Sequence, residues 1–417
     1  MLRSRALAAV VAGALSLGLV GCTPEPMPVP TPTPSETAAP TGDGVLRIGT
    51  LFPTTGSTAF IAKAQDAGVE LAIREINEAG GVNGKPVEVF HRDSGDAGST
   101  KAETSLANLL EKKVDVVIGP SSSVLAERLL PAIVDSRVTM ISPSATDPAL
   151  SALNDNGYLF RTIPSAALQG SALAEIAGKG GKAAIVYFSD VAGKAVLDSL
   201  TSGLKAVKGK LVASEAFTAT TGDVDKIVSA LKEAEPSVVV LVSPFSAMTK
   251  NKAIIAALAK AGLAGSKLWL TSQNLADYSQ ALPAGTLKDV NGILDGATPD
   301  AAFTKRVKSA DPSVTDFRYS AEAYDATILA ALAAIVAGDD SGDAVARTLR
   351  SVASSGIKCT SFGECLDVLK TRSDIDYDGI SGPLTLDKAG DPHPVQYGLY
   401  RYDANNKYKL VGSATAG

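Results

Sequence analysis

Histidine is scarce in this chain, with two residues among 417, His91 and His393. A histidine-based triad, a multi-histidine metal site or a histidine general base would have to rest on one of them. His91 ends an expected strand and His393 lies in a turn-like Asp-Pro-His-Pro segment, so both are expected to be structural. The sequence also contains neither a Gly-x-Ser-x-Gly elbow nor a His-Glu-x-x-His helix. We therefore expect a protein that is not an enzyme and uses no metal or cofactor.

Aromatic residues and positive charge are also in short supply. The chain has 10 Phe, 10 Tyr and 1 Trp, a formal net charge of −5 and no long basic run. Few aromatic faces are available for stacking on bases or sugar rings, which weakens a carbohydrate ligand without excluding it. The charge balance offers little attraction to a polyanion, so no nucleic acid partner is expected.

The N-terminal apolar run is too short for a comfortable transmembrane helix. Arg3 and Arg5 precede Ala6–Val20, which falls below the ~20 apolar residues that span a bilayer comfortably. This pattern indicates an export signal, and Leu-Val-Gly-Cys ending at Cys22 resembles the lipobox of bacterial lipoproteins. We expect residues 1–21 to be a lipoprotein signal peptide and Cys22 to carry a lipid that anchors the chain to the extracytoplasmic face of the cell membrane. Plain secretion is the alternative.

Residues 22–44 are rich in proline and threonine and show no apolar periodicity. Such a segment cannot bury a core and favours extended conformers. It is expected to be a tether, either a spacer that holds the folded part away from the bilayer or a linker without a length requirement.

Cysteine is rare as well. With Cys22 assigned to the anchor, Cys359 and Cys365 remain. Export places them in an oxidising compartment, where a disulfide persists. Zinc ligation is the alternative, but Cys-x5-Cys alone is not a zinc signature. We expect the two cysteines to pair.

Length and periodicity predict an α/β chain with two domains. From Val45 onward, short β-branched runs alternate with helical stretches such as Ala64–Ala79, in which Val69, Ile73 and Ile76 recur at helical spacing. The rhythm breaks around 283–299, after which helices are expected at 301–310, 317–337 and 344–353. The expected strands are 45–51, 87–91, 114–118, 138–141, 183–188, 210–217, 238–242 and 267–270, with a closing β-meander of 384–386, 396–402 and 407–411.

Two polar loops each follow an expected strand. Gly-Pro-Ser-Ser-Ser (119–123) follows one strand and Ser-Pro-Ser-Ala-Thr (142–146) follows another. The carboxyl ends of parallel strands form the ligand crevice of open sheets, and helix N-termini there favour an anion. Ordinary helix capping by serine and threonine is the alternative explanation. The loops together suggest a carboxylate site.

Read in order, these loops make the chain resemble the type I periplasmic binding proteins, in the leucine/isoleucine/valine-binding branch of ABC-importer receptors. The resemblance covers about residues 45–411 and is carried by 79–89, 116–150, 160–170, 321–327 and 376–392. It implies two lobes, each a mostly parallel sheet flanked by helices, joined by three hinge crossings. One lobe would take 45–163 with 297–381, and the other 164–296 with 382–417.

The resemblance also implies binding residues. Ser123, Ser144 and Thr146 would grip the carboxylate and ammonium of an amino acid, with Ser144 acting chiefly through its backbone. Phe245 or Ser246 would close over the ligand from the other lobe.

Two positions depart from the family pattern. Gln273 stands where an acidic residue contacts the ammonium, and Ala192 where many relatives carry a tyrosine. An amide cannot balance the positive charge of an ammonium. Amides, ureas and other carboxylates therefore become more plausible ligands.

The function implied is that of a membrane-anchored substrate-binding lipoprotein of an ABC importer. The chain would act as a monomer, capture a small polar solute between its lobes and present it to the permease subunits. A ligand-sensing receptor that uses the same cleft is one alternative. An extracytoplasmic hydrolase is another, but it would need a nucleophile and a base that the sequence does not supply.

Overall fold

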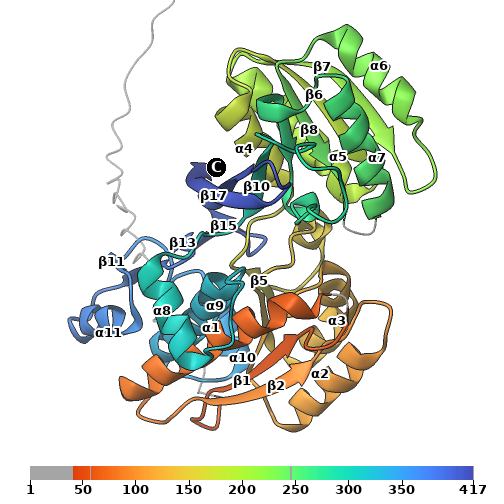
Figure 1. Cartoon of the computed structure of the whole chain (residues 1–417). Helices are drawn as coiled ribbons and strands as arrows, with labels where there is room; N and C mark the ends of the chain where they lie inside the picture. Colours follow the sequence, from red (N-terminus) through yellow and green to blue (C-terminus); the bar gives the residue numbers. More distant parts are fainter. Residues whose placement is uncertain (1–40, 57, 245–246, 417) are drawn as a thin grey trace, which may run out of the picture. The chain divides into compact units, whose positions relative to one another are not determined.

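The computed structural model describes residues 41–56, 58–244 and 247–416. The predicted signal peptide, Cys22, the tether up to residue 40, Phe245 and Ser246 lie outside the described residues. These described residues belong to one compact unit. As expected, the fold is α/β, with parallel sheets flanked by helices (Figure 1).

The first sheet has five parallel strands in the order β2-β1-β3-β4-β5. Its three last strands are buried along their whole length, as parallel strands covered on both faces must be. The strands are β1 (Arg47–Phe52), β2 (Glu88–Asp93), β3 (Val116–Ile118), β4 (Thr139–Ser142) and β5 (Leu159–Arg161).

Side chains that alternate along the strands of this sheet pack into two hydrophobic clusters, one on each face. Val116 and Ile118 of β3 pack in a cluster with α1 (Ala59–Glu78) and α9 (Ser320–Ala337). Val117 points to the other face, where its cluster includes α2 (Lys101–Glu111) and α3 (Ser123–Ser136). Figure 1 shows these helices around the sheet. The first cluster also takes residues of α8 (Ala301–Ala310) and α10 (Gly342–Thr348).

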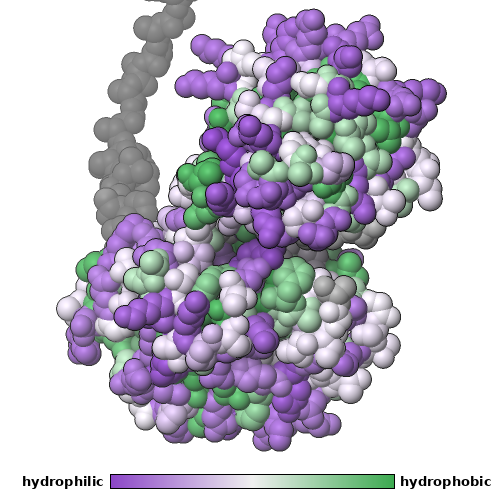
Figure 2. All heavy atoms as spheres, viewed as in Figure 1, coloured by the Kyte–Doolittle hydropathy of each residue, from purple (hydrophilic) through white to green (hydrophobic). Residues whose placement is uncertain are grey.

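Helix α9 is a core helix. Of the helices in the described residues, it is the one long and apolar enough to cross a membrane, yet 83% of its apolar window is buried within the fold. Its apolar side chains therefore pack against the first sheet. The molecular face in Figure 2 is mostly hydrophilic or neutral, with hydrophobic side chains in small separate patches.

The second sheet has seven strands in the order β17-β16-β10-β9-β8-β6-β7. β8 alternates like β3: Val239 and Leu241 face α6 (Val224–Ala234) and α7 (Met248–Lys260), whereas Val240 faces α4 (Ala167–Ala177) and α5 (Val191–Ala206). The strands are β6 (Lys182–Phe188), β7 (Lys210–Phe217), β8 (Val238–Val242), β9 (Leu268–Leu270), β10 (Asn291–Asp295), β16 (Val395–Tyr402) and β17 (Tyr408–Ala416).

Two strands of the large sheets, β5 and β10, were not predicted, and neither were the short strands β11, β12, β13 and β15. β10 lies inside the expected break at 283–299 and pairs with both β9 and β16. Its sequence begins with Asn-Gly, which is typical of a turn, so the following Ile-Leu pair was not recognised as part of a strand. β5 is three residues long and ends in Arg161, so it is too short to show a periodic pattern of apolar residues.

The expected strands at 396–402 and 407–411 are confirmed as β16 and β17, but the strand expected at 384–386 does not join them in a meander. β14 (Thr385–Leu386) pairs with β15 (Pro392–His393) in a separate two-stranded piece, whereas β16 and β17 join the second sheet as an antiparallel hairpin. Leu384 and Leu386 pack in the cluster of α1 and α9, although the prediction placed them with the second lobe. The limits of the two lobes stay a prediction.

A small three-stranded sheet carries the disulfide. It consists of β11 (Ile357–Cys359), β12 (Ile375–Gly379) and β13 (Gly382–Pro383). Cys359 ends β11 and Cys365 lies in α11 (Phe362–Lys370), and their sulfur atoms are bonded, as expected. The bridge joins this strand to the helix that follows it.

Candidate ligand-binding site

A pocket of about 600 Å³ lies where strands of both large sheets end. Every lining segment follows the carboxyl end of a parallel strand or begins a helix, the position at which open α/β sheets bind ligands. From the first sheet the lining residues are Pro53, Thr58, Ile61, Ser94, Gly95, Asp96, Ala97, Gly98, Ser121 and Ser122, and from the second they are Pro244 and Gln273.

The first predicted loop turns sharply out of β3. Gly119 has φ +117°, and a Cβ there would lie 2.6 Å from the carbonyl oxygen of Leu51, so the position requires glycine. Ser122 is the N-cap of α3 and accepts a hydrogen bond from the Leu125 N–H at 3.4 Å. The N-terminus of α3 therefore opens beside the pocket with the partial positive charge of a helix start.

The second predicted loop is tied directly to the first. Ser142 Oγ donates to the carbonyl oxygen of Pro120 at 2.6 Å, and Ser144 Oγ donates to that of Ser121 at 3.4 Å. Ser123 Oγ accepts from the Asp147 N–H at 3.1 Å. The structure thus brings both loops together at one edge of the sheet.

Gln65 of α1 bridges the two loops, and the sequence analysis missed it. Its side chain is fully buried; its Oε1 accepts from Ser121 Oγ at 2.6 Å and its Nε2 donates to Ser144 Oγ at 2.8 Å. Gln65 lies four residues before Val69 on the apolar stripe of its helix. A polar residue on that stripe was the available signal, because a buried amide needs partners.

Of the predicted contacts, Gln273 lines the pocket. It lies in the short helix η4 (Ser272–Asn274) after β9. Its neighbour Asn274 is buried and donates to the Leu241 carbonyl oxygen at 2.9 Å. This bond fixes the turn to the end of β8, so Gln273 is presented from a rigid base.

The other predicted residues stand back from the lining or lie outside the described residues. Ser123, Ser144 and Thr146 belong to the loops that support the lining serines, and their contact with a ligand stays a prediction. The carbonyl oxygen of Thr146 accepts from the Ala166 N–H at 2.8 Å. Ala192 is buried in the first turn of α5. Phe245 and Ser246 directly follow Pro244 in the undescribed gap.

The loop after β2 also lines the pocket, and no motif had marked it. Asp93 holds its first turn by accepting from the Gly95 N–H at 2.8 Å and from Lys101 Nζ at 2.8 Å. Burial acts to raise the pKa of Asp93, but its bonds to Lys101 and Thr55 hold that pKa well below the ordinary value. Asp93 therefore stays ionised and keeps the loop in place.

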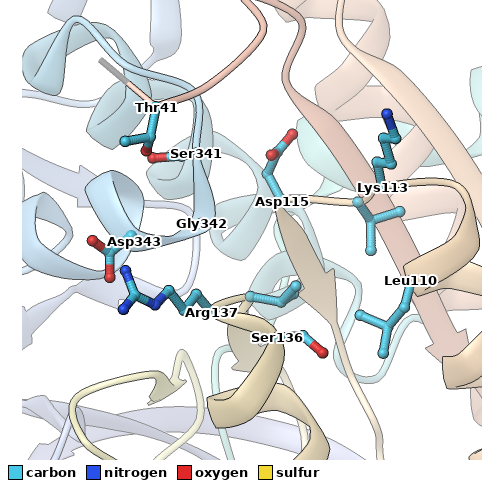
Figure 3. Close-up of a pocket in the computed structure, with 11 residues that line it drawn as sticks. Thr41, Leu110, Lys113, Asp115, Ser136, Arg137, Ser341, Gly342 and Asp343 are labelled. Carbon is cyan, nitrogen blue, oxygen red and sulfur yellow. The ribbon is translucent and has the colours of Figure 1, made fainter. Parts of the chain in front are cut away.

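A second cavity, of about 390 Å³, lies at the opposite ends of the strands (Figure 3). Figure 3 shows Asp115, Lys113, Arg137 and Asp343 around it. The lining residues 113–115 and 136–138 precede the amino ends of β3 and β4. Burial raises the pKa of Asp115 to about 7. Amino ends are not where open α/β sheets gather ligands, so the pocket at the carboxyl ends is the better candidate.

The described residues show no candidate metal-binding site. No group of three or more His, Cys, Asp or Glu side chains there is arranged to hold a metal ion. What the pocket offers instead is hydroxyls, an amide, a carboxylate and backbone groups.

Comparison with known proteins points the same way as the geometry. The family model described as "Periplasmic binding protein" matches residues 45–365. A chemotactic signal transduction system substrate-binding protein, BasB of Halobacterium salinarum, is 27% identical over 361 residues, which cover 83% of this chain and 84% of that protein.

Two solved structures share the fold. The branched-chain amino acid transporter substrate-binding protein LivJ of Streptococcus pneumoniae, in complex with isoleucine, superimposes with a TM-score of 0.64 at 21% identity, covering 89% of this chain and 99% of that one. A solute-binding protein of an ABC transporter from R. palustris, in complex with benzoate, gives 0.59 at 18% identity, covering 89% and 97%. Both are described as substrate- or solute-binding proteins of transporters.

Proposed function

Because the chain belongs to the periplasmic binding protein family, we propose that it is the substrate-binding lipoprotein of an ABC importer. It captures a small polar solute and delivers it to the permease subunits. The observation that carries this proposal is the pocket lined by Ser121 and Ser122 from one sheet and by Gln273 from the other. A site shared between two sheets suits a receptor that closes on its ligand.

The ligand is proposed to bind with its carboxylate at the start of α3. Ser123 is the first residue of α3, and Ser144 Oγ donates to the carbonyl oxygen of Ser121 just before it. Backbone N–H groups and the helix dipole favour an anion at such a helix start, and Ser123, Ser144 and Thr146 are proposed to contact it. Since Gln65 engages the Ser144 hydroxyl, Ser144 would act through its backbone. Gln273, with Phe245 or Ser246, would contact the other end of the solute from the second lobe.

The lipid anchor completes the proposal. A lipidated Cys22 would retain the receptor at the outer face of the cell membrane, and the Pro/Thr-rich tether would let it reach the permease. Residues 164–296 with 382–417 would move against the first lobe as the cleft closes, and the permease would recognise the closed monomer.

A ligand-sensing receptor is the second candidate, favoured by the similarity to BasB of a chemotactic signalling system. The two roles use the same cleft and differ in the partner. Uptake of the labelled solute should be lost when this chain is deleted and restored when it is returned. Unchanged uptake together with a lost behavioural response to the solute would favour the sensor.

The first test of solute binding is a thermal-shift screen. Residues 22–417 with Cys22→Ser would be screened against amino acids, amides, ureas, short peptides and organic acids. A ligand that binds the folded state alone raises the melting temperature with its concentration. We expect at least one specific stabiliser, which would also name the chemical class. No response across the whole panel would contradict the proposed function.

A further inference from the structure

The second sheet carries a group of lysines at the amino ends of β6 and β7, which pair with each other at one edge of that sheet (Figure 1). Two turns meet there, one leading from α4 into β6 and the other from α5 into β7. The Gly180 N–H of the first turn donates to the carbonyl oxygen of Val207 at 3.1 Å. In return, the Lys210 N–H donates to the carbonyl oxygen of Gly181 at 2.9 Å. The lysines on and beside these joined turns form what we call the lysine corner: Lys179, Lys182, Lys205, Lys208 and Lys210.

The lysine corner has no counter-charge in contact with it. All five side chains are exposed, and none of them takes part in an ion pair with another described residue. Lys182 and Lys210 are partners in the register of β6 and β7, although like charges on neighbouring strands repel. The acidic residues of the adjoining segments, Glu175, Glu233 and Glu235, also form no ion pair with these lysines. The corner is therefore a local positive charge on a chain whose formal net charge is −5.

The geometry of the turns does not suit a single bound phosphate ion. A phosphate loop binds through free backbone N–H groups, but here the Gly181 N–H donates to the carbonyl oxygen of Gly178 at 3.0 Å. The Lys182 N–H donates to Ser237 Oγ at 3.1 Å. No lysine of the corner lines either of the two pockets described above. What remains is a group of exposed, hydrated point charges, which suits an extended anionic surface better than one enclosed ion.

We propose that the lysine corner docks the second sheet on an anionic phospholipid bilayer. Groups of roughly four to eight Lys or Arg side chains are attracted to anionic headgroups, and the attraction acts within a Debye length of the surface. The lipid proposed at Cys22 would keep the folded part close to the bilayer, so a contact that is weak by itself becomes effective. Because the solute pocket lies at the carboxyl ends of the strands, docking through the amino ends leaves it uncovered.

Co-sedimentation with vesicles tests this contact without a lipid anchor and without a solute. Residues 22–417 with Cys22→Ser would be mixed with vesicles of pure phosphatidylcholine or with vesicles that contain about 40% phosphatidylglycerol. We expect the partition coefficient to be at least tenfold higher for the anionic vesicles at about 0.05 M salt. Raising the salt to about 0.3 M should abolish this preference, because it shortens the Debye length.

A variant of the lysine corner and a matched control locate the contact. Glutamine keeps the length of the side chain and removes its charge, so the corner variant carries Lys179→Gln, Lys182→Gln, Lys208→Gln and Lys210→Gln. Its partition coefficient on the anionic vesicles should fall at least tenfold. The control has the same net charge, should bind like the parent, and replaces four exposed lysines from other parts of the chain: Lys194→Gln, Lys226→Gln, Lys305→Gln and Lys388→Gln. Melting temperatures report whether both variants are folded.

Three results would overturn the proposal. One is a parent protein that prefers anionic vesicles no more than neutral ones, and another is an equal loss of binding in the corner variant and the control. The third is release of the parent from the vesicles by inorganic phosphate at constant ionic strength, which would make a bound phosphate ion the ligand of the corner. Solute binding is measured separately by the thermal-shift screen, so failure of the lysine corner leaves the proposed function untouched.

Discussion

Arg161 and Asp391 form a buried, two-pronged ion pair between residues 230 positions apart. Arg161 Nε donates to Asp391 Oδ1 at 2.6 Å and a terminal nitrogen donates to Oδ2 at 2.5 Å. The other terminal nitrogen donates to the carbonyl oxygens of Ala145, at 3.2 Å, and Asp147, at 3.1 Å, within and just after the second predicted loop. The pair therefore ties this loop to the C-terminal part of the chain.

Asp391→Asn should be strongly destabilising. It leaves the guanidinium of Arg161, 1% exposed, without its counter-charge, and breaking a buried pair in this way costs about 3–5 kcal/mol. Urea denaturation would measure the change in the free energy of unfolding. Asp367→Asn is the control, because it breaks the exposed Lys370–Asp367 pair and should cost at most about 1 kcal/mol. Similar values for the two variants would contradict a structural role for the buried pair.

Gln65→Leu should loosen the ligand-binding edge. The substitution leaves the hydroxyls of Ser121 and Ser144 without their shared partner, at a cost of about 1–3 kcal/mol in the free energy of unfolding. Affinity for the solute should fall as well, because both loops border the pocket. Unfolding and binding would be measured on the same preparation, with Gln280→Leu in the loop after η4 as a control on an exposed glutamine. Unchanged affinity would remove Gln65 from the support of the site.

Ser123→Ala should weaken binding by about 1–3 kcal/mol if the hydroxyl bonds the ligand. The same hydroxyl accepts from the Asp147 N–H, so the unfolding free energy must be measured alongside. Calorimetry with the ligand found in the thermal screen gives the affinity. An unchanged affinity would exclude Ser123 as a contact.

Glu322 predicts a pH dependence of stability. Burial raises its pKa to about 8, and one of its carboxyl oxygens is buried without a hydrogen-bond partner among the described residues. The folded state therefore holds this proton more tightly than the unfolded chain, whose glutamates titrate near 4.3. The resulting stability is present below that value and is lost as the pH rises towards about 8.

Glu322→Gln tests this sign. The variant carries no titrating group at the position, so its stability relative to the parent should increase between pH 5 and 9, roughly the window spanned by the two pKa values. His91, whose pKa is raised to about 9, is present in both proteins and cancels in the difference. Urea denaturation of both proteins across the pH series measures this difference in the free energy of unfolding. A constant difference between the proteins would refute the shift.

Cys22→Ser should release the protein from the membrane. Without the thiol no lipid can be attached, so the chain should move from the membrane fraction to the soluble fraction. Mass spectrometry of the parent should find a lipid-modified cysteine at the mature N-terminus. An unmodified N-terminal residue downstream of Cys22 would instead indicate plain secretion.

The sequence by itself determined the fold class and most of the strands. Strands β3 and β8 are runs of β-branched and aliphatic residues, so their local composition identifies them. The two polar loops could also be recognised in the sequence, since segments rich in serine and threonine follow β3 and β4. Position along the chain was enough to place them at one edge of the sheet, because parallel strands end together.

Only the tertiary structure decided which side chains complete the pocket. Gln65 is one polar residue on an apolar helical stripe, and its meaning appears when α1 packs against both loops. The loop 94–98 lines the pocket, and Arg128, from a distant helix, donates hydrogen bonds to the carbonyl oxygens of Ala97 and Ser99 next to it. β10 and the Arg161–Asp391 pair likewise depend on segments distant in sequence. Local sequence patterns indicate which residues are buried and where turns lie. The partner of a buried polar group is instead set by packing between segments that are distant in sequence, and a local pattern carries no information about it.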